Sequence, residues 1–330
     1  IYSGSRRRNP SGKCREIPPP RCSGEKRLKS LLLRPHAKIN LGLRVLGIRS
    51  DGYHEIRTRF QTVDLRDEME ISLAPRDLEV RVEGARLAGD RTNLVVKAAE
   101  ALRETGRGVP GARIRLVKKI PLAAGLGGGS SDAAAALLGL ERLWGLDLDP
   151  GELHRVAARL GADVPFFLQG GTALGKGRGD EICPLPDLAP CGICLVLAPF
   201  ESSTADVYSR WDRLPPASCP PDGEREAAFS NPSGAESRET VRNDLQDVVF
   251  ACHPELRHFW NLLHVAGAEA ASVSGSGPTL YGLFSSAERA RAFRESRDWE
   301  PFRVVECSPV GREEYLDRVG LASGLERGNS

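Results

Sequence analysis

The residues best suited to bind phosphate lie in one short segment, PLAAGLGGGSS. It stands between a strand-like apolar run and an alanine-rich run that is typical of a helix. Glycine lacks a Cβ, so its backbone N–H can turn toward a ligand, and a helix start adds partial positive charge. The segment therefore predicts a phosphate site. Its residues are Pro121, Leu122, Ala123, Ala124, Gly125, Leu126, Gly127, Gly128, Gly129, Ser130 and Ser131.

This segment matches neither of the two common nucleotide motifs. No Lys-Ser or Lys-Thr pair follows the glycines, as a P-loop requires, and the spacing of Gly125, Gly127 and Ser130 does not fit GxGxxG. A flexible connection that only permits tight packing is the alternative interpretation, but loops seldom need so many glycines directly before a helix. We therefore predict a phosphate loop of another kind.

Two more glycine-containing segments accompany the phosphate loop. They are GADVPFFLQGGTALGKGRGD at residues 161–180 and SVSGSGPTL at residues 272–280. Taken alone, the glycines of the first are typical of hairpin turns, and Gly275 and Gly277 of a β-bulge. Their significance lies in their occurrence beside the phosphate loop in one chain.

Hydrophobic periodicity predicts the elements that hold these segments. Alternation over residues 31–75 predicts strands, and residues 112–121 read as a further strand. Apolar residues spaced by three and four predict helices over 93–106, 130–145 and 150–161. Ser130 is expected to cap the helix that follows the phosphate loop.

The second half of the chain also alternates strands with helices. Strands are predicted over 193–199, 272–284 and 301–307, and helices over 204–214, 253–267 and 286–296. This mixture is typical of an α+β fold. Residues 1–30, basic and rich in Pro, Ser and Gly, predict a disordered tail, with a transit peptide as the less favoured alternative. Residues 215–240 predict a flexible insertion.

Composition limits the kinds of partner. The 330 residues carry a formal net charge of +2, which argues against a dedicated nucleic-acid surface, and no apolar run approaches the roughly 18 residues that cross a bilayer. Cys191 and Cys194 form one CxxC pair without the second pair that a zinc site needs. We expect ordinary thiols, in preference to a metal or redox site, in a cytoplasmic protein that acts on a small molecule.

Together the segments resemble the three motifs of the GHMP kinase superfamily. PHAKINLGLRVLG at residues 35–47, the phosphate loop and SVSGSGPTL occur in the order of those motifs. Residues 49–64, RSDGYHEIRTRFQTVD, and residues 160–180 are similar to the branch that phosphorylates 4-diphosphocytidyl-2-C-methyl-D-erythritol in the non-mevalonate isoprenoid pathway. The resemblance extends over residues 33–315.

The resemblance implies an α+β fold of two domains with the site between them. The N-terminal ATP-binding domain, residues 31–190, is expected to be ribosomal protein S5 domain 2-like, and the C-terminal domain, residues 191–315, ferredoxin-like. Residues 316–330 are expected to be a frayed tail.

The resemblance also implies the chemistry of individual residues. Lys38 and Asp163 match the catalytic lysine and aspartate of the superfamily, so that Asp163 would accept the proton of the acceptor hydroxyl and Lys38 would assist electrostatically. Asn40, Tyr53 and His54 are implied to bind the acceptor, with His54 at the base.

Three further features follow from the resemblance. An aromatic residue of the C-terminal half is expected to stack on cytosine, and both Phe200 and Tyr208 are candidates. ATP is the expected co-substrate and Mg²⁺ the expected metal, although the sequence identifies no protein ligand for the ion. Ala123 stands where many relatives have glycine, which predicts slightly different backbone freedom but no loss of the phosphate site.

Two other functions remain as alternatives. Another GHMP kinase, such as a homoserine or mevalonate kinase, is the nearer one, and DGYHE at residues 51–55 argues against it. A non-catalytic nucleotide-binding protein of the same fold is the second, and Lys38 and Asp163 argue against that.

Overall fold

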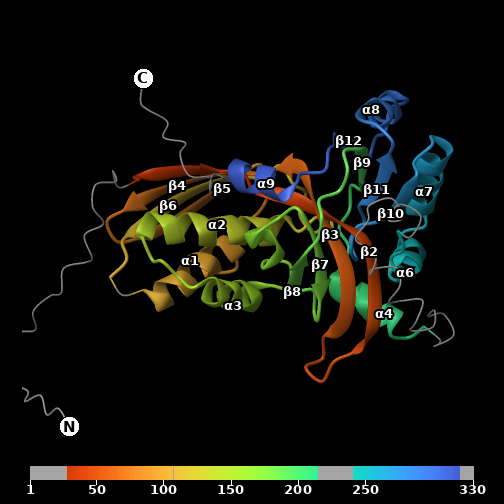
Figure 1. Cartoon of the computed structure of the whole chain (residues 1–330). Coiled ribbons are helices and arrows are strands. Elements are labelled where there is room, and N and C mark those ends of the chain that lie inside the picture. Colours follow the sequence, from red (N-terminus) through yellow and green to blue (C-terminus); the bar gives the residue numbers. More distant parts are fainter. Residues whose placement is uncertain (1–27, 107, 215–240, 320–330) are drawn as a thin grey trace, which may run out of the picture.

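The computed structural model describes residues 28–106, 108–214 and 241–319. These residues form three four-stranded sheets with helices packed on them (Figure 1). Most of the expected basic tail, the expected insertion at 215–240 and the end of the chain from residue 320 lie outside the described residues.

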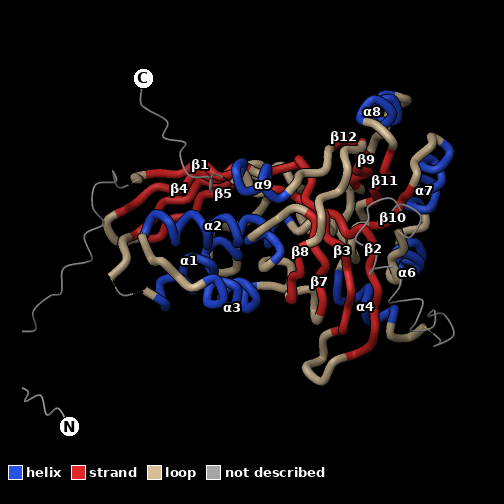
Figure 2. The backbone as a smooth tube through the Cα atoms, viewed as in Figure 1, coloured by secondary structure: helices blue, strands red, loops and turns tan. Residues whose placement is uncertain are grey.

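The first sheet forms one end of the molecule and carries three helices on one face (Figure 2). Its strands, in spatial order, are β1 (Ser30–Leu33), β4 (Glu68–Ala74), β6 (Gly111–Val117) and β5 (Leu78–Glu83). The helices are α1 (Leu94–Thr105), α2 (Gly128–Trp144) and α3 (Pro150–Leu160). Four consecutive alanines of α2, Ala133 to Ala136, are buried, and their small side chains let the helix lie close to its neighbours. This packing fixes the start of α2, where the phosphate loop ends.

The second sheet is built on a long hairpin. Its strands, in spatial order, are β2 (His36–Ile48), β3 (His54–Arg66), β7 (Thr172–Lys176) and β8 (Glu181–Pro184). A turn at Asp51 and Gly52 joins β2 to β3, and Gly52 has the positive φ of +83° that such a turn favours. The predicted hairpin in the glycine-rich segment is also present, between β7 and β8. A short 3₁₀ helix, η1 (Phe166–Leu168), precedes β7.

The third sheet belongs to the second half of the chain. Its strands, in spatial order, are β10 (Ala270–Val273), β11 (Leu280–Phe284), β9 (Gly192–Leu197) and β12 (Arg303–Cys307). In the described residues of this half, the helices that come before β12 are α4 (Thr204–Trp211), α6 (Gln246–Cys252), α7 (Glu255–Val265) and α8 (Ala287–Glu295). Every residue of the inner strand β9 is buried, which is typical of a strand with a continuous apolar run.

Three expectations from the sequence are wrong. Ser130 does not cap α2, because the helix already begins at Gly128 after a left-handed Gly127. Residues 272–284 are not one strand but parts of β10 and β11, because a turn closed by a hydrogen bond from Ser274 N to Thr279 O separates them. The expected tail from residue 316 begins inside α9 (Arg312–Arg318), which is held by the buried Tyr315.

The two halves share elements across the expected boundary. Val310, Tyr315 and Val319 join the core of the first sheet, and the Tyr315 hydroxyl donates to the carbonyl of Phe167 at 2.6 Å. Conversely, Leu43 of β2 packs in the core of the third sheet. The second sheet therefore fixes the two halves relative to each other, and a site between them has a stable frame. Among the described helices, none has the length and apolar character needed to span a membrane.

Candidate active site

A cavity of about 940 Å³ lies where the two halves meet. One side is lined by the phosphate loop and β2, and the other by α4 and the turn between β10 and β11. Pro121 to Ser130 of the predicted phosphate loop line this cavity, whereas Ser131 is fully buried. The cavity also contains Lys38, Asn40, Tyr53, His54 and Asp163, so the structure brings the predicted catalytic and acceptor-binding residues together.

The start of α2 faces the cavity through its glycines. Gly127 has φ +68° and ψ 17°, and the helix follows without a side chain that caps its first amides. A helix start leaves its first N–H groups without intrahelical partners and carries partial positive charge. The loop therefore presents an uncapped helix start to any anion in the cavity.

The phosphate loop is in contact with the third glycine segment. Ser274 Oγ donates to the carbonyl of Gly125 at 2.9 Å. A Cβ on Gly125 would lie 2.2 Å from Ser274 O, and one on Gly277 would lie 2.3 Å from Gly125 N. Only glycine fits on both sides of this contact, so the two segments act as one unit.

Lys38 lies at the centre of the site and is almost fully buried. Its Nζ donates to Asn40 Oδ1 at 2.6 Å and to the carbonyl of Gly125 at 3.1 Å. The same nitrogen lies 3.4 Å from Asp163 Oδ2. Lys38 thus connects β2 to the phosphate loop and to the predicted base. A buried ammonium that keeps three oxygen partners is held in one position.

Asn40 accepts a hydrogen bond from Lys38 and is itself fixed in orientation by a neighbour. Its amide nitrogen donates to Thr58 Oγ1 at 2.7 Å, and that hydroxyl donates to the carbonyl of Gly42 at 2.8 Å. This chain orients the amide so that its oxygen faces the lysine. In the described residues Asn40 therefore acts on Lys38 directly, in addition to lining the cavity.

Asp163 sits on the turn between α3 and η1. Its side chain is 31% exposed and lines the cavity. Burial raises the pKa of Tyr208, and the negative charge of Asp163 raises it further. The predicted base is therefore reachable from the cavity and lies beside the ammonium of Lys38.

Aromatic side chains gather at the far end of the cavity. The rings of His54 and Tyr208 have centroids 4.5 Å apart, and Trp211 contacts His54 edge-on at 6.0 Å. Tyr208 lines the cavity, whereas Phe200 stacks on His253 at 4.5 Å. Of the two candidates for stacking on a base, Tyr208 is the one whose ring is available at the site.

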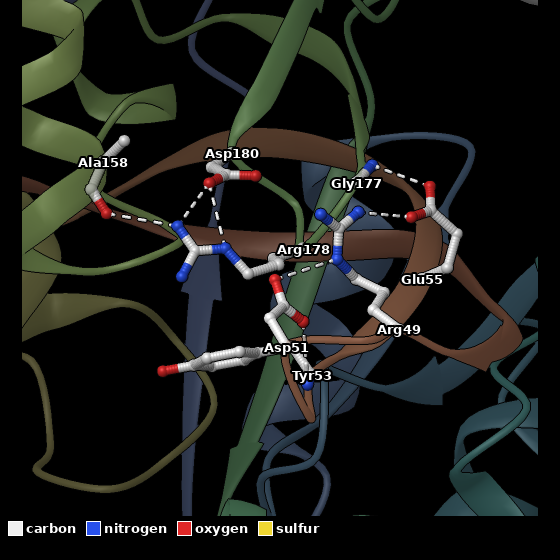
Figure 3. A network of polar contacts seen from close by, with 8 residues as sticks. All are labelled: Arg49, Asp51, Tyr53, Glu55, Ala158, Gly177, Arg178 and Asp180. Carbon is white, nitrogen blue, oxygen red and sulfur yellow. Dashed lines mark hydrogen bonds and ion pairs between the residues drawn. The ribbon is translucent and has the colours of Figure 1, made fainter.

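Two site residues were missed by the sequence reasoning. Asp212 Oδ1 lies 2.7 Å from Nε2 of His54, and the Arg178 guanidinium lies 4.9 Å from the ring centroid of Tyr53 (Figure 3 shows Arg178 and Tyr53). Both line the cavity. In the sequence, Arg178 is marked only by its place in the segment GKGRGD. Asp212 is marked only by its position one turn after Tyr208 on the predicted helix.

A buried ionic cluster lies under the phosphate loop. Lys118 Nζ contacts Asp67 and, at 2.7 Å, Asp132 Oδ2, while Asp67 Oδ1 accepts from the backbone of Lys119 and Ile120 at 2.5 and 2.8 Å. Burial strongly raises the pKa of Asp132, against the effect of Lys118. Burial lowers the pKa of Lys118, but the two carboxylates outweigh this and raise it. The cluster joins β6 to α2 and so fixes both ends of the loop.

Cys194 of the CxxC pair lies in an environment that favours the neutral thiol. Cys194 is buried on β9 and its thiol donates to the carbonyl of Ala290 at 3.0 Å. Burial raises the pKa of Cys194 to about 12, which disfavours the thiolate that nucleophiles and zinc ligands need.

The chain is similar to known proteins over most of its length. Residues 93–171 match the family described as GHMP kinases N terminal domain, and residues 227–298 the family described as GHMP kinases C terminal. The 4-diphosphocytidyl-2-C-methyl-D-erythritol kinase of Moorella thermoacetica is 43% identical over 264 residues, covering 79% of this chain and 92% of that protein. The kinase of the same description from Solibacter usitatus is 45% identical over 291 residues, covering 86% and 90%.

Solved structures agree with these relatives. A crystal structure of 4-(cytidine 5'-diphospho)-2C-methyl-D-erythritol kinase matches with a TM-score of 0.73 and 34% identity, covering 85% of this chain and 100% of that one. A homoserine kinase from Cytophaga hutchinsonii matches with a TM-score of 0.70 at 20% identity, covering 89% and 99%, and so shares the fold. The chain therefore belongs to the 4-diphosphocytidyl-2-C-methyl-D-erythritol kinase family of the GHMP kinases.

Proposed function

We propose that the protein transfers the γ-phosphoryl group of ATP to the 2-hydroxyl of 4-diphosphocytidyl-2-C-methyl-D-erythritol. The products are the 2-phosphate and ADP, and the reaction supplies isoprenoid precursors. The observation that carries the proposal is the 3.4 Å pairing of Lys38 and Asp163 beside the phosphate loop. The names of the relatives supply the acceptor.

The geometry supports a simple division of labour. ATP would place its phosphates against the uncapped start of α2, whose amides face the cavity. Asp163 would accept the proton of the acceptor hydroxyl. As it does so, the hydroxyl oxygen would form a bond to the γ-phosphorus, and the bond between the γ-phosphorus and the oxygen that bridges to the β-phosphate would break. Lys38 would stabilise the negative charge that develops at this centre, because its ammonium is held beside Asp163.

The aromatic end of the cavity suits the cytidyl group. Tyr208 and Tyr53 each provide a flat face, and Nδ1 of His54 can bond to the edge of a base while Nε2 contacts Asp212. We propose Tyr208 as the stacking partner of cytosine, because Tyr208 lines the cavity and Phe200 does not. Asn40 would contribute through its hold on Lys38.

We also propose that Mg²⁺ accompanies ATP. Within the described residues no cluster of three or more His, Cys, Asp or Glu side chains is placed to hold a metal ion. This fits Mg²⁺, which usually binds through one or two carboxylates plus substrate phosphates and keeps several waters. The Asp163 carboxylate and the Ser130 hydroxyl line the cavity and offer oxygen atoms. When bound, the ion would neutralise charge on the transferring group; chelation should abolish turnover and added Mg²⁺ should restore it.

A panel of acceptors tests the proposal. ADP release should be fastest with 4-diphosphocytidyl-2-C-methyl-D-erythritol and close to background with homoserine and mevalonate. The likeness to homoserine kinase, at 20% identity, concerns the fold alone. Preferential turnover of homoserine or mevalonate would exclude the proposed acceptor, and ATP binding without turnover of any of them would favour a non-catalytic nucleotide-binding protein.

We propose a cytoplasmic location for this activity. Cys183, Cys191, Cys194, Cys252 and Cys307, which are the cysteines in the described parts of the chain, form no disulfide, as is usual in reducing compartments. Cell fractionation followed by immunodetection would test this, and recovery outside the cytoplasmic fraction would contradict it.

A further inference from the structure

Arg178 occupies a central place on the cavity wall. It lies in the turn between β7 and β8, and its guanidinium faces the ring of Tyr53 at 4.9 Å from the centroid. Figure 3 shows the guanidinium between Tyr53 on one side and Ala158 of α3 on the other. The end of α3 leads directly to the turn that carries Asp163, which lines the same cavity. Arg178 therefore lies beside Tyr53 and the end of α3, on the wall of the cavity that also contains Asp163.

The guanidinium is held in one orientation. Its Nε and Nη2 donate to Asp180 Oδ2 at 3.2 and 2.6 Å, and Nη2 also contacts the carbonyl of Ala158 at 3.4 Å. Nη1 takes part in none of these contacts. The side chain is 26% exposed, so its free edge can meet a ligand. The hydrogen bond to Asp180 raises the pKa of Arg178, so it stays a cation at all working pH values.

The other cations on the cavity wall are already engaged. Lys38 pairs with Asp163, and Lys118 is buried between Asp67 and Asp132. Arg178 has one carboxylate partner and a free edge. An acceptor that joins a cytidyl group to a polyol through a diphosphate carries its charge between these two parts. A guanidinium fork is well matched to phosphate oxygens.

We infer that Arg178 binds the diphosphate of the acceptor through its free edge, while the face of the guanidinium supports Tyr53. This inference rests on the proposed function, because it takes the diphosphate from that acceptor. Asp180 then acts as a positioning residue that aims the guanidinium. The competing interpretation is purely structural: Arg178 would only hold Tyr53, and the ligand's charge would not matter to it.

The test compares ligands that share the base and differ in charge. Affinities of cytidine, CMP and CDP are measured by calorimetry for the unchanged protein and for Arg178→Met. We expect CDP binding to weaken about tenfold or more and cytidine binding to change less than about twofold. The KM for the full acceptor should rise by a similar factor as CDP affinity falls, with the KM for ATP unchanged. Arg178→Lys should recover part of the CDP affinity, because it keeps the charge and loses the fork.

Arg49 provides a matched control. It pairs with Asp51 at 3.3 Å and Glu55 at 2.6 Å (Figure 3). Arg49 does not line the cavity. Arg49→Met should leave all three affinities unchanged. If Arg178→Met weakens cytidine and CDP equally, or changes neither, the inference is wrong. If Arg178→Met does not fold, Arg178→Lys provides the test. A ratio of CDP affinity to cytidine affinity that is the same in Arg178→Lys as in the unchanged protein would reject the inference. Because these are binding measurements, they remain decisive if the acceptor panel rejects the proposed reaction.

Discussion

Lys38 Nζ lies 3.4 Å from Asp163 Oδ2 and donates to the carbonyl of Gly125 at 3.1 Å. One ammonium thus joins three segments that are far apart in the sequence: β2, the phosphate loop and the turn after α3. Each contact has a separate role. The carbonyl contact aligns the loop with β2, and the carboxylate contact places the base beside the cation.

Asp163→Asn is the sharpest change at this centre. The amide keeps the shape of the side chain but cannot accept the proton, so we expect kcat to fall roughly a hundredfold or more. Binding of a fluorescent ATP analogue should be nearly unchanged. Asp147→Asn is a suitable control, because Asp147 is exposed and its φ of +46° is tolerated by asparagine. Near-normal kcat in Asp163→Asn would remove this residue from the role of base.

The phosphate loop tolerates no side chain at Gly125. Alanine there would place its Cβ 2.2 Å from Ser274 O, in a backbone conformation with φ +78°. We expect Gly125→Ala to raise the KM for ATP strongly, because the loop must separate from the β10–β11 turn. Gly129→Ala should be milder, since its Cβ would meet only Leu94 at 3.6 Å. Steady-state kinetics with varied ATP compares the two, and equal effects would show that the contact with Ser274 is unimportant.

The contact between Asp212 and His54 should affect the acceptor and spare ATP. Asp212→Ala removes the partner 2.7 Å from Nε2, so the imidazole loses its fixed orientation against Tyr208. We expect the KM for the acceptor to rise about tenfold, with kcat and the KM for ATP little changed. Asp212→Asn should restore part of the loss, because its oxygen still accepts from Nε2–H. A change in the KM for ATP of the same size would point to a general loss of structure.

Some parts of this site followed from the sequence and others did not. The phosphate loop and its helix were predicted because glycine content, alanine content and spacing are local properties. Lys38 and Asp163 followed from the family resemblance, but their 3.4 Å separation did not. Arg178 and Asp212 were missed because their roles arise only when separate elements meet: the β7–β8 turn with the β2–β3 turn, and α4 with β3.

The fold shows the same division between local and long-range information. The predicted helices and most predicted strands are present, but β5 and α6 were not anticipated, because their patterns are short. The choice between Phe200 and Tyr208 depended on tertiary packing. Val207 of α4 packs in the core, and Tyr208 beside it faces His54. Ala123 was expected to alter backbone freedom, and its φ of +50° is a conformation that glycine adopts more easily.

His36 makes folding stability depend on pH. Burial lowers its pKa from the ordinary value of 6.5 to about 4, although its Nδ1 contacts the carbonyl of Arg34 at 2.7 Å. The unfolded chain therefore binds a proton at higher pH than the folded protein does. The contribution of His36 to the free energy of unfolding is therefore fully present above about pH 6.5. It is lost as the pH drops toward 4, which lowers the free energy of unfolding by about 3 kcal/mol at most.

Urea unfolding at several pH values measures this effect. The free energy of unfolding of His36→Phe should fall less between pH 7 and pH 4.5 than that of the unchanged protein, because the variant has no proton to bind there. Phenylalanine keeps an aromatic ring beside Tyr315, whose ring lies 5.6 Å from that of His36. Identical pH dependence in the two proteins would mean that His36 does not contribute.

The ³¹P NMR spectrum of the product identifies the hydroxyl group that the protein phosphorylates. Incubation with ATP, Mg²⁺ and 4-diphosphocytidyl-2-C-methyl-D-erythritol should give ADP and a new monophosphate ester in equal amounts. The carbon at position 2 carries a methyl group and no hydrogen, so the ester signal should show no three-bond coupling to a proton. A coupled ester signal would place the phosphate on another hydroxyl, and no new ester at all would contradict the proposed reaction.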